Sequence, residues 1–179
     1  MRRINVRTLG VTAGTRAAEA ALALAALVGL ITGADTAHAS QARLTHAEAT
    51  ARLRAADVEW SSSKGCSDKN GNGCTSFDGI LAATLDLAID LKKRSHCEVM
   101  ITGAAEVHPH RTTGTRTHGN GYKIDVRPNS CVGAFVTDHF HRAGTRGEAK
   151  DPKWTAGSAE YVLEKHGKKG EHWDITYTG

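Results

Sequence analysis

Histidine is frequent in this chain of 179 residues, which contains ten. Nine of the ten follow residue 39, and three groups stand out: His108 with His110, then His118, then His172. Imidazole is the commonest zinc ligand in proteins, and a catalytic zinc site uses three protein ligands plus a water molecule. The histidines therefore indicate where metal chemistry would take place.

One stretch places two metal-binding side chains close together. In Thr-His-Gly-Asn-Gly-Tyr-Lys-Ile-Asp, His118 stands at the mouth of a predicted strand and Asp125 lies inside it. Gly119 and Gly121 allow the loop to fold tightly, so that both side chains can reach one ion. A third ligand has to come from elsewhere, and His172 in the last predicted strand is the obvious donor.

The first 39 residues have the three parts of a secretory signal peptide. Residues 1–16 contain four arginines and no acid, residues 20–34 are almost wholly apolar, and Ala-His-Ala precedes Ser40. A membrane-anchoring helix is the alternative, but it needs a longer apolar run. We therefore expect export to the cell-wall space or the periplasm, with residues 40–179 as one mature domain and no membrane span after removal of the signal.

Charge and composition exclude several classes of protein. The chain is 40% hydrophobic, which is too high for a disordered protein. Residues 40–179 carry a formal charge of +2, with acids and bases well mixed, whereas nucleic-acid binders usually concentrate Lys and Arg. No nucleic-acid partner is expected, and because no long apolar stripe demands a partner we expect a monomer.

The four cysteines lie in the mature domain and are most simply interpreted as two disulfides. Sequence alone leaves three pairings open. We favour Cys66–Cys74, which closes a short polar loop, and Cys97–Cys131, which joins two core elements. A cysteine-only zinc cluster is the rival, but the chain has no Cys-x-x-Cys pair.

Local patterns predict a small α+β domain with helices packed on a mixed, mainly antiparallel sheet. A capping box at Thr45 and Glu48 opens a helix to about Asp57, and Ser76 is predicted to cap the next. The predicted helices are 45–57, 76–93 and 131–142. The predicted strands are 98–102 and 122–126, with a C-terminal hairpin of 161–165 and 171–177. The predicted loops are 61–75, the Gly-, His- and Thr-rich stretch up to Asn120, and 144–157.

Three short motifs resemble those of a known enzyme family. Residues 117–126, Thr-His-x-x-Gly-x-x-x-Asp-Val, resemble the signature of zinc D-alanyl-D-alanine carboxypeptidases and L-alanyl-D-glutamate endopeptidases. Ile-Thr-Gly at 101–103 is similar to the strand that enters their site, and His-Trp-Asp-Ile at 172–175 is similar to their last metal-bearing strand. The resemblance covers most of residues 44–177, and it extends to secreted bacterial and phage peptidases of this kind.

This resemblance implies both a fold and a reaction. The fold would be that of the hedgehog-like zinc peptidases, with His118, Asp125 and His172 as ligands of Zn²⁺ and water in the fourth position. The expected function is that of a secreted zinc metallopeptidase that hydrolyses peptidoglycan stem peptides, as a D,D-carboxypeptidase or an L,D- or D,D-endopeptidase. A carboxylate would accept the proton of the attacking water.

The chain departs from the family pattern at this carboxylate. In many relatives the acid stands three residues before the last histidine, where this chain has Lys169. Glu171 is the nearest acid upstream and is our prediction for the catalytic base. Strand alternation points Glu171 away from the face that carries His172. Asp174 shares that face and is the alternative, either as the base or as a group that steadies an imidazole.

A second departure concerns substrate binding. Relatives usually carry an Arg soon after the Gly of the entering strand, whereas this chain has Ala-Ala-Glu-Val at 104–107. Lys123, where relatives often have Ala, has no assigned role and is consistent with a side chain that points to solvent. The groups that can replace the missing Arg or donate to an oxyanion lie in the following loop: Arg111, Arg116, His108 and His110.

Two other functions remain open. A binding module can keep the zinc and the fold without turnover, and it would associate with the cell wall. Alternatively the protein is a small disulfide-linked extracellular domain without a metal, in which His172 is an ordinary half-buried residue. No Gly-x-Ser-x-Gly turn supports a serine hydrolase.

Overall fold

The computed structural model describes residues 41–108 and 113–179. The predicted signal peptide, residues 1–39, lies outside the described residues. Three α-helices are described: α2 (His46–Ala55), α3 (Ala82–Ser95) and α4 (Ser130–His139). The strands before α4 are β1 (Arg43–Leu44), β2 (Glu59–Trp60), β3 (Ile80–Leu81), β4 (Met100–Gly103) and β5 (Lys123–Val126). Those after it are β6 (His141–Arg146), β7 (Asp151–Ala156), β8 (Ala159–Glu164) and β9 (His172–Tyr177).

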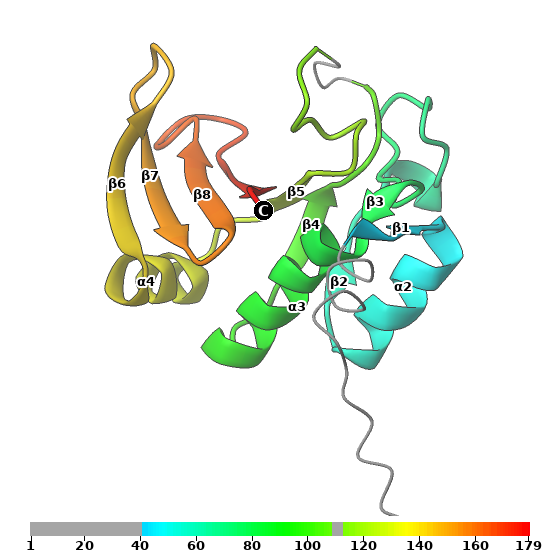
Figure 1. Cartoon of the computed structure of the whole chain (residues 1–179), viewed down its shortest axis with the longest axis horizontal. Helices are drawn as coiled ribbons and strands as arrows, with labels where there is room; N and C mark the ends of the chain where they lie inside the picture. The colour runs from blue at the N-terminus through cyan, green and yellow to red at the C-terminus, as the bar shows by residue number, and fades with distance from the viewer. Residues whose placement is uncertain (1–40, 109–112) are drawn as a thin grey trace, which may run out of the picture. The chain divides into compact units, whose positions relative to one another are not determined.

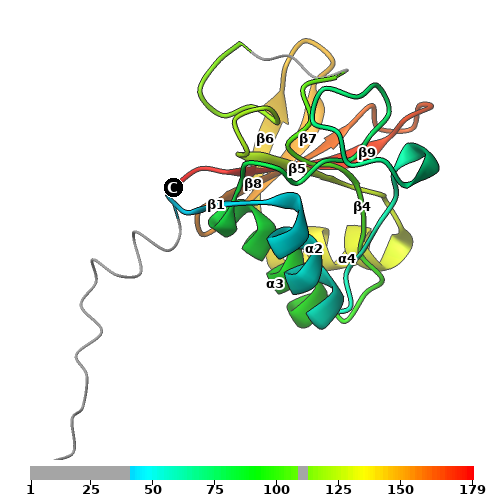
Figure 2. The same ribbon diagram turned by 90° about the vertical axis from the view of Figure 1, so that its right-hand side faces the viewer.

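Seven of the strands form one sheet in the order β2-β4-β5-β9-β8-β7-β6. The β2–β4 pair is parallel and the other pairs are antiparallel, while β1 and β3 form a separate two-stranded sheet. The helices lie on one side of the large sheet and the long loops on the other (Figures 1 and 2). The predicted class, a small α+β domain with a mixed and mainly antiparallel sheet, is confirmed.

Side-chain alternation separates a hydrophobic face of the sheet from a polar one. The hydrophobic face packs with the helices into the core and contains Ile124, Val126, Tyr161, Trp173 and Ile175. The opposite face of the same strands carries Lys123, Asp125, Glu164, His172 and Asp174. The polar side chains are therefore gathered on the face that the helices leave uncovered.

The first helix begins where the sequence predicts. The Thr45 side chain accepts a hydrogen bond from the backbone N–H of Glu48 (3.3 Å), and the Glu48 carboxylate accepts one from the N–H of Thr45 (2.8 Å). Because both bonds of the capping box form locally, the signal is readable without tertiary context. The helix ends at Ala55, two residues before the predicted end.

The second helix begins five residues later than predicted, with its cap at Leu81 instead of Ser76. The Ser76 hydroxyl accepts from the N–H of Asp78 in a local turn, and the chain then turns at Gly79, whose φ is +83°. Ile80–Leu81 pairs with Arg43–Leu44 as β3, so the helix starts only at Ala82. Tertiary strand pairing overrides the helical pattern here.

The region after α4 also differs from the prediction. Asn129 caps α4 through a bond from the N–H of Val132 (2.8 Å), and the helix ends at His139, so that 140–142 are not helical. The expected loop at 144–157 instead contributes to the antiparallel pair β6–β7. β6 is the edge strand and β7 lies next to it, and apart from Trp154 their residues are exposed or half-buried, so that their composition is polar like that of a loop.

Both favoured disulfides are present. Cys66–Cys74 closes the loop before β3, and Cys97–Cys131 joins the segment after α3 to α4. The predicted C-terminal hairpin is also present as β8 and β9.

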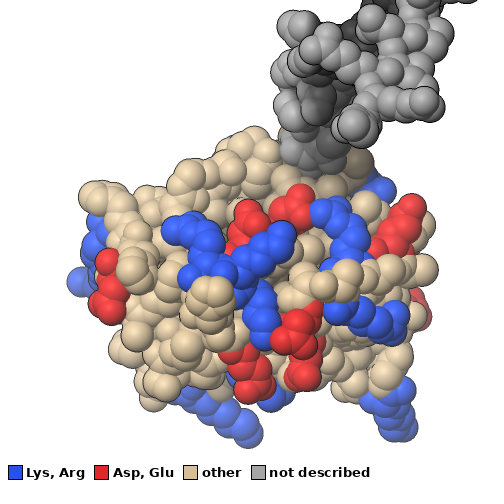
Figure 3. Space-filling model, turned by 90° about the horizontal axis from the view of Figure 1, so that it is seen from below, with Lys and Arg blue, Asp and Glu red and all other residues tan. Residues whose placement is uncertain are grey.

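The helical face of the domain has a mixed charge. Basic and acidic side chains are interspersed over this face (Figure 3). Two ion pairs connect the α2 and α3 regions, Arg52 with Asp86 and Lys92 with Asp57. Within the described residues, no helix is long and apolar enough to span a membrane.

Gly121 provides a test of the packing beneath the His118 loop. Its φ is +76°, and a Cβ there would clash with the Gly79 carbonyl oxygen. Gly157 also has a positive φ, but a Cβ there would meet nothing within 4 Å. We expect Gly157→Ala to cost about 1 kcal/mol of unfolding free energy from backbone strain alone. We expect Gly121→Ala to cost about 2 kcal/mol more, from the clash with backbone. Urea denaturation measures both, and equal costs would contradict the described packing.

Candidate metal centre

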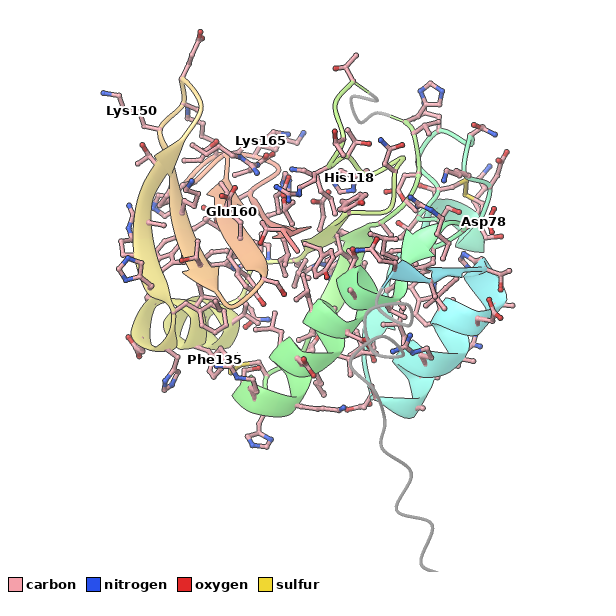
Figure 4. All side chains as sticks on the ribbon, viewed as in Figure 1. Asp78, His118, Phe135, Lys150, Glu160 and Lys165 are labelled. Carbon is pink, nitrogen blue, oxygen red and sulfur yellow. A yellow bond between two sulfur atoms is a disulfide. The ribbon has the colours of Figure 1, made fainter. Side chains whose placement is uncertain are left out.

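His118 reaches the sheet from a compact loop. The Thr117 hydroxyl accepts from the N–H of Asn120 (3.1 Å), and the His118 carbonyl accepts from the N–H of Gly121 (2.7 Å). The His118 side chain is buried, and it lies above the sheet on the side away from the helices (Figure 4). The glycine-rich loop therefore folds tightly, as predicted, and directs this imidazole inward.

The register of β5 with β9 brings the other predicted ligands to the same place. Asp125 is directly opposite Asp174, and His172 lies two residues before Asp174 on the same face. The Asp125 Oδ1 atom lies 3.4 Å from Nε2 of His118 and 3.7 Å from Nε2 of His172. Ligand atoms of a tetrahedral zinc site with bonds of about 2.0–2.1 Å would lie about 3.3 Å apart. Each predicted imidazole ligand thus lies near the Asp125 carboxylate, whereas the ligand atoms that all lie within 4.8 Å of one another are those of His118, Asp125 and Asp174.

Both imidazoles are oriented through their other nitrogen. Nδ1 of His118 lies 2.7 Å from the carbonyl oxygen of Ala104, and Nδ1 of His172 lies 2.8 Å from that of Gly170. Because a carbonyl only accepts, each Nδ1 carries the hydrogen in these bonds. In the neutral imidazoles Nε2 is then left with its lone pair, and both Nε2 atoms lie next to Asp125.

Asp174 is also near enough to take part. Ligand atoms of His118, Asp125 and Asp174 all lie within 4.8 Å of one another, and this buried group could hold a metal ion. However, the Asp174 carboxylate already accepts from Lys123 (2.6 and 2.9 Å) and from Arg146 (3.2 Å). These two cations overcome the effect of burial and hold the pKa of Asp174 far below its usual range. To bind a metal ion, Asp174 would have to lose its hydrogen bonds from Lys123 and Arg146.

The two residues that bind Asp174 were not among the site residues predicted from sequence. Lys123, which we associated with solvent, instead points to Asp174 and is mostly buried. Arg146 extends from the edge strand β6 to Asp174, Glu164 and Glu160. Neither contact is readable from sequence, because each depends on the register of strands far apart in the chain.

Glu164 is a site residue that the sequence analysis missed. It pairs with His172 across the β8–β9 hairpin, and its Oε2 lies 3.2 Å from Nε2 of His172. The hairpin itself was predicted, but a connection of seven residues does not fix its register. With that register known, Glu164 would have been the acid to consider.

Glu171, our predicted base, lies in the β8–β9 loop. Its carboxylate accepts from the backbone N–H of Gly167 (2.5 Å) and lies 3.0 Å from Nδ1 of His166. Among the described contacts, the Glu164 carboxylate lies next to His172, whereas the Glu171 carboxylate lies next to His166 and Gly167 in the loop. The role of Glu171 therefore stays a prediction.

Two of the loop groups considered as replacements for the missing Arg, Arg116 and His108, lie at the surface. Arg116 donates to the carbonyl of Thr178 (2.6 Å) and is exposed, as is His108. His110 and Arg111 lie outside the described residues.

The local charges favour a cation. Burial works to lower the pKa of His118, but the adjacent Asp125 carboxylate raises it above its ordinary value. Burial also works to lower the pKa of His172, but the hydrogen bond to Glu164 and the charge of Asp125 raise this pKa to about 9. Burial works to raise the pKa of Asp125, but the two histidines hold it below its ordinary value. Protons and a metal ion would therefore compete for the same nitrogens.

Comparisons with family models, curated proteins and solved structures found no match to this chain.

Gly103 tests whether Asp125 belongs to the metal centre. A Cβ at Gly103 would lie 2.6 Å from the Asp125 Oδ2 atom, so Gly103→Ala must displace this carboxylate. We expect Zn²⁺ affinity to fall by about tenfold or more, as when the support of a ligand is lost. Gly133→Ala is the control, since a Cβ there meets nothing within 4 Å. A chelator-competition titration that gives equal Zn²⁺ affinities for wild type and both variants would contradict this assignment.

Proposed function

We propose that the chain is a secreted zinc metallopeptidase that hydrolyses peptide bonds in peptidoglycan stem peptides. The observation that carries the proposal is the arrangement of two imidazoles around one carboxylate. Each Nδ1 is bonded to a backbone carbonyl, and each Nε2 lies within 3.7 Å of the Asp125 Oδ1 atom. Metal-binding histidines typically have this backbone support.

The donor set fits zinc. Two neutral imidazole nitrogens and one carboxylate are a common protein ligand set of catalytic zinc sites. We assign His172 rather than Asp174 as the third ligand, because Asp174 is bound by Lys123 and Arg146. Zinc held by His118, Asp125 and His172 would act as a Lewis acid and lower the pKa of a water molecule to about 7.

We assign the proton-accepting role to Glu164. Its carboxylate lies beside Nε2 of His172, and in the metal-free protein the hydrogen bond from the protonated His172 holds the pKa of Glu164 below its ordinary value. Glu164 is therefore ionised near neutral pH and can accept a proton at Oε2. Arg146 binds the same carboxylate and would fix its orientation. Glu171, and after it Asp174, remain the alternatives from sequence.

The substrate class is supported by the sequence rather than by the contacts. The motifs at 101–103, 117–126 and 172–175 resemble those of peptidases that cut stem peptides, and the 1–39 segment resembles an export signal. Two disulfides are consistent with an extracellular location.

One observation favours a non-catalytic zinc module that binds the cell wall. Both candidate proton acceptors already have partners, Glu164 with Arg146 and Glu171 with His166. Such a module would retain zinc and associate with insoluble wall material without releasing amines.

Zinc content and hydrolysis test the proposal together. We expect the disulfide-intact protein to contain about one zinc per chain, measured by elemental mass spectrometry, and His118→Ala to lose it. We also expect it to cleave muropeptides, and this activity to disappear with chelator and return with zinc. Zinc retention without any cleavage would favour the binding module. Failure to take up zinc would remove both functions.

The base is identified by a pair of isosteric variants. Glu164→Gln removes the proton acceptor, and we expect the rate of hydrolysis to fall by about 10²–10⁴-fold. Zinc content should persist, because Glu164 is not an assigned ligand. Glu171→Gln is the matched control, with activity near that of wild type. If Glu171→Gln loses activity and Glu164→Gln does not, with zinc retained in both variants, Glu171 is the base and our assignment of Glu164 is wrong.

A further inference from the structure

Glu106 is a buried carboxylate that the proposed reaction does not use. It lies three residues after β4, and only 2% of its surface is exposed. Its two oxygens lie 3.0 Å from the backbone nitrogen of Ala104, and one also accepts from the N–H of Ser76 at 3.0 Å. A carboxylate in such a place is expensive to bury unless hydrogen bonds stabilise it, so its partners indicate its role.

These partners belong to the segment that orients His118. The Ala104 carbonyl accepts from Nδ1 of His118 (2.7 Å), and the next N–H, of Ala105, donates to the carbonyl of Ser76 (2.6 Å). The peptide unit between Ala104 and Ala105 is therefore held at its oxygen by His118 and at its nitrogen by Ser76. Glu106 completes this arrangement, because it binds Ala104 and Ser76 at the same time.

The Ser76 side of this arrangement is itself anchored. The Thr75 hydroxyl donates to the carbonyl of Ser61 (2.7 Å), and the N–H of Thr75 donates to the Ser62 hydroxyl (2.8 Å). Cys74, directly before Thr75, forms the disulfide with Cys66. Glu106 thus connects a disulfide-closed loop to the backbone carbonyl that His118 uses.

We propose that Glu106 is a positioning residue of the metal centre, which acts through the Ala104 carbonyl to fix the orientation and tautomer of His118. This role rests on the proposed zinc site but not on peptidase activity. Without the carboxylate, the 104–105 peptide can reorient, and His118 then loses the acceptor that holds the hydrogen on Nδ1. Outer groups that support a metal ligand typically contribute 10–100-fold in metal affinity.

Glu106→Gln in the full chain tests the proposal with two readouts. Glutamine keeps one acceptor oxygen but places an N–H₂ group against a backbone donor. We expect Zn²⁺ affinity, from chelator competition, to fall at least about tenfold. We also expect the metal-free protein to lose the Nδ1–H tautomer of His118 in histidine-labelled ¹⁵N NMR spectra. Glu48→Gln is the control, because its carboxylate also binds backbone, at the distant capping box.

The outcomes separate this role from the proposed function. If wild type takes up no zinc, the proposed function fails, while the tautomer in metal-free protein still decides the role of Glu106. An unchanged tautomer in Glu106→Gln, or an unchanged affinity where wild type binds zinc, would overturn the role. If Glu106→Gln does not fold, Glu106→Asp is judged by the same two readouts. If neither variant folds, Glu106 supports the whole domain and the positioning role is rejected.

Discussion

The antiparallel pairing of β5 with β9 is the constraint on which the candidate site depends. These strands lie inside the large sheet, so their apolar side chains must face the helices, and every second residue must face the other way. Asp125, His172 and Asp174 are therefore on one face without any dedicated turn or insertion. A slip of one residue would bury these groups in the core, which makes the register strongly determined. His118 is the only one of the four that has to be brought in by a loop.

The polar face is stable because its charges are compensated across strands. Asp174 is almost wholly buried, and Lys123 and Arg146 supply the positive charge that burial demands. The charged partners of Asp125 and Asp174 also distinguish these two aspartates as candidate metal ligands. Asp125 has the two imidazoles as its described ion-pair partners, whereas Asp174 has permanent cations. A metal ion placed beside Asp125 replaces protons on the histidines, and the network around Asp174 can remain in place.

The predictions from sequence succeeded where the determining interactions are local. The capping box at Thr45 and the short Cys66–Cys74 loop involve residues within one turn or loop, and they form as expected. The alternation in the last strand likewise indicated that His172 and Asp174 share a face. By contrast, Glu164 reaches His172 only through a register that a seven-residue connection leaves undefined. The polar edge strand β6 and its neighbour β7 resemble a loop because their burial is slight. The late start of α3 depends on pairing with Arg43–Leu44, which no local pattern records.

The most direct test of the central claim is a crystal structure of the zinc-loaded protein with anomalous diffraction at the zinc absorption edge. Our interpretation predicts one strong anomalous peak within bonding distance of Nε2 of His118, Nε2 of His172 and the Asp125 carboxylate, with Lys123 still bound to Asp174. A peak between His118, Asp125 and Asp174, with Lys123 displaced, would contradict the ligand assignment. The absence of any peak at these residues would contradict the metal centre itself.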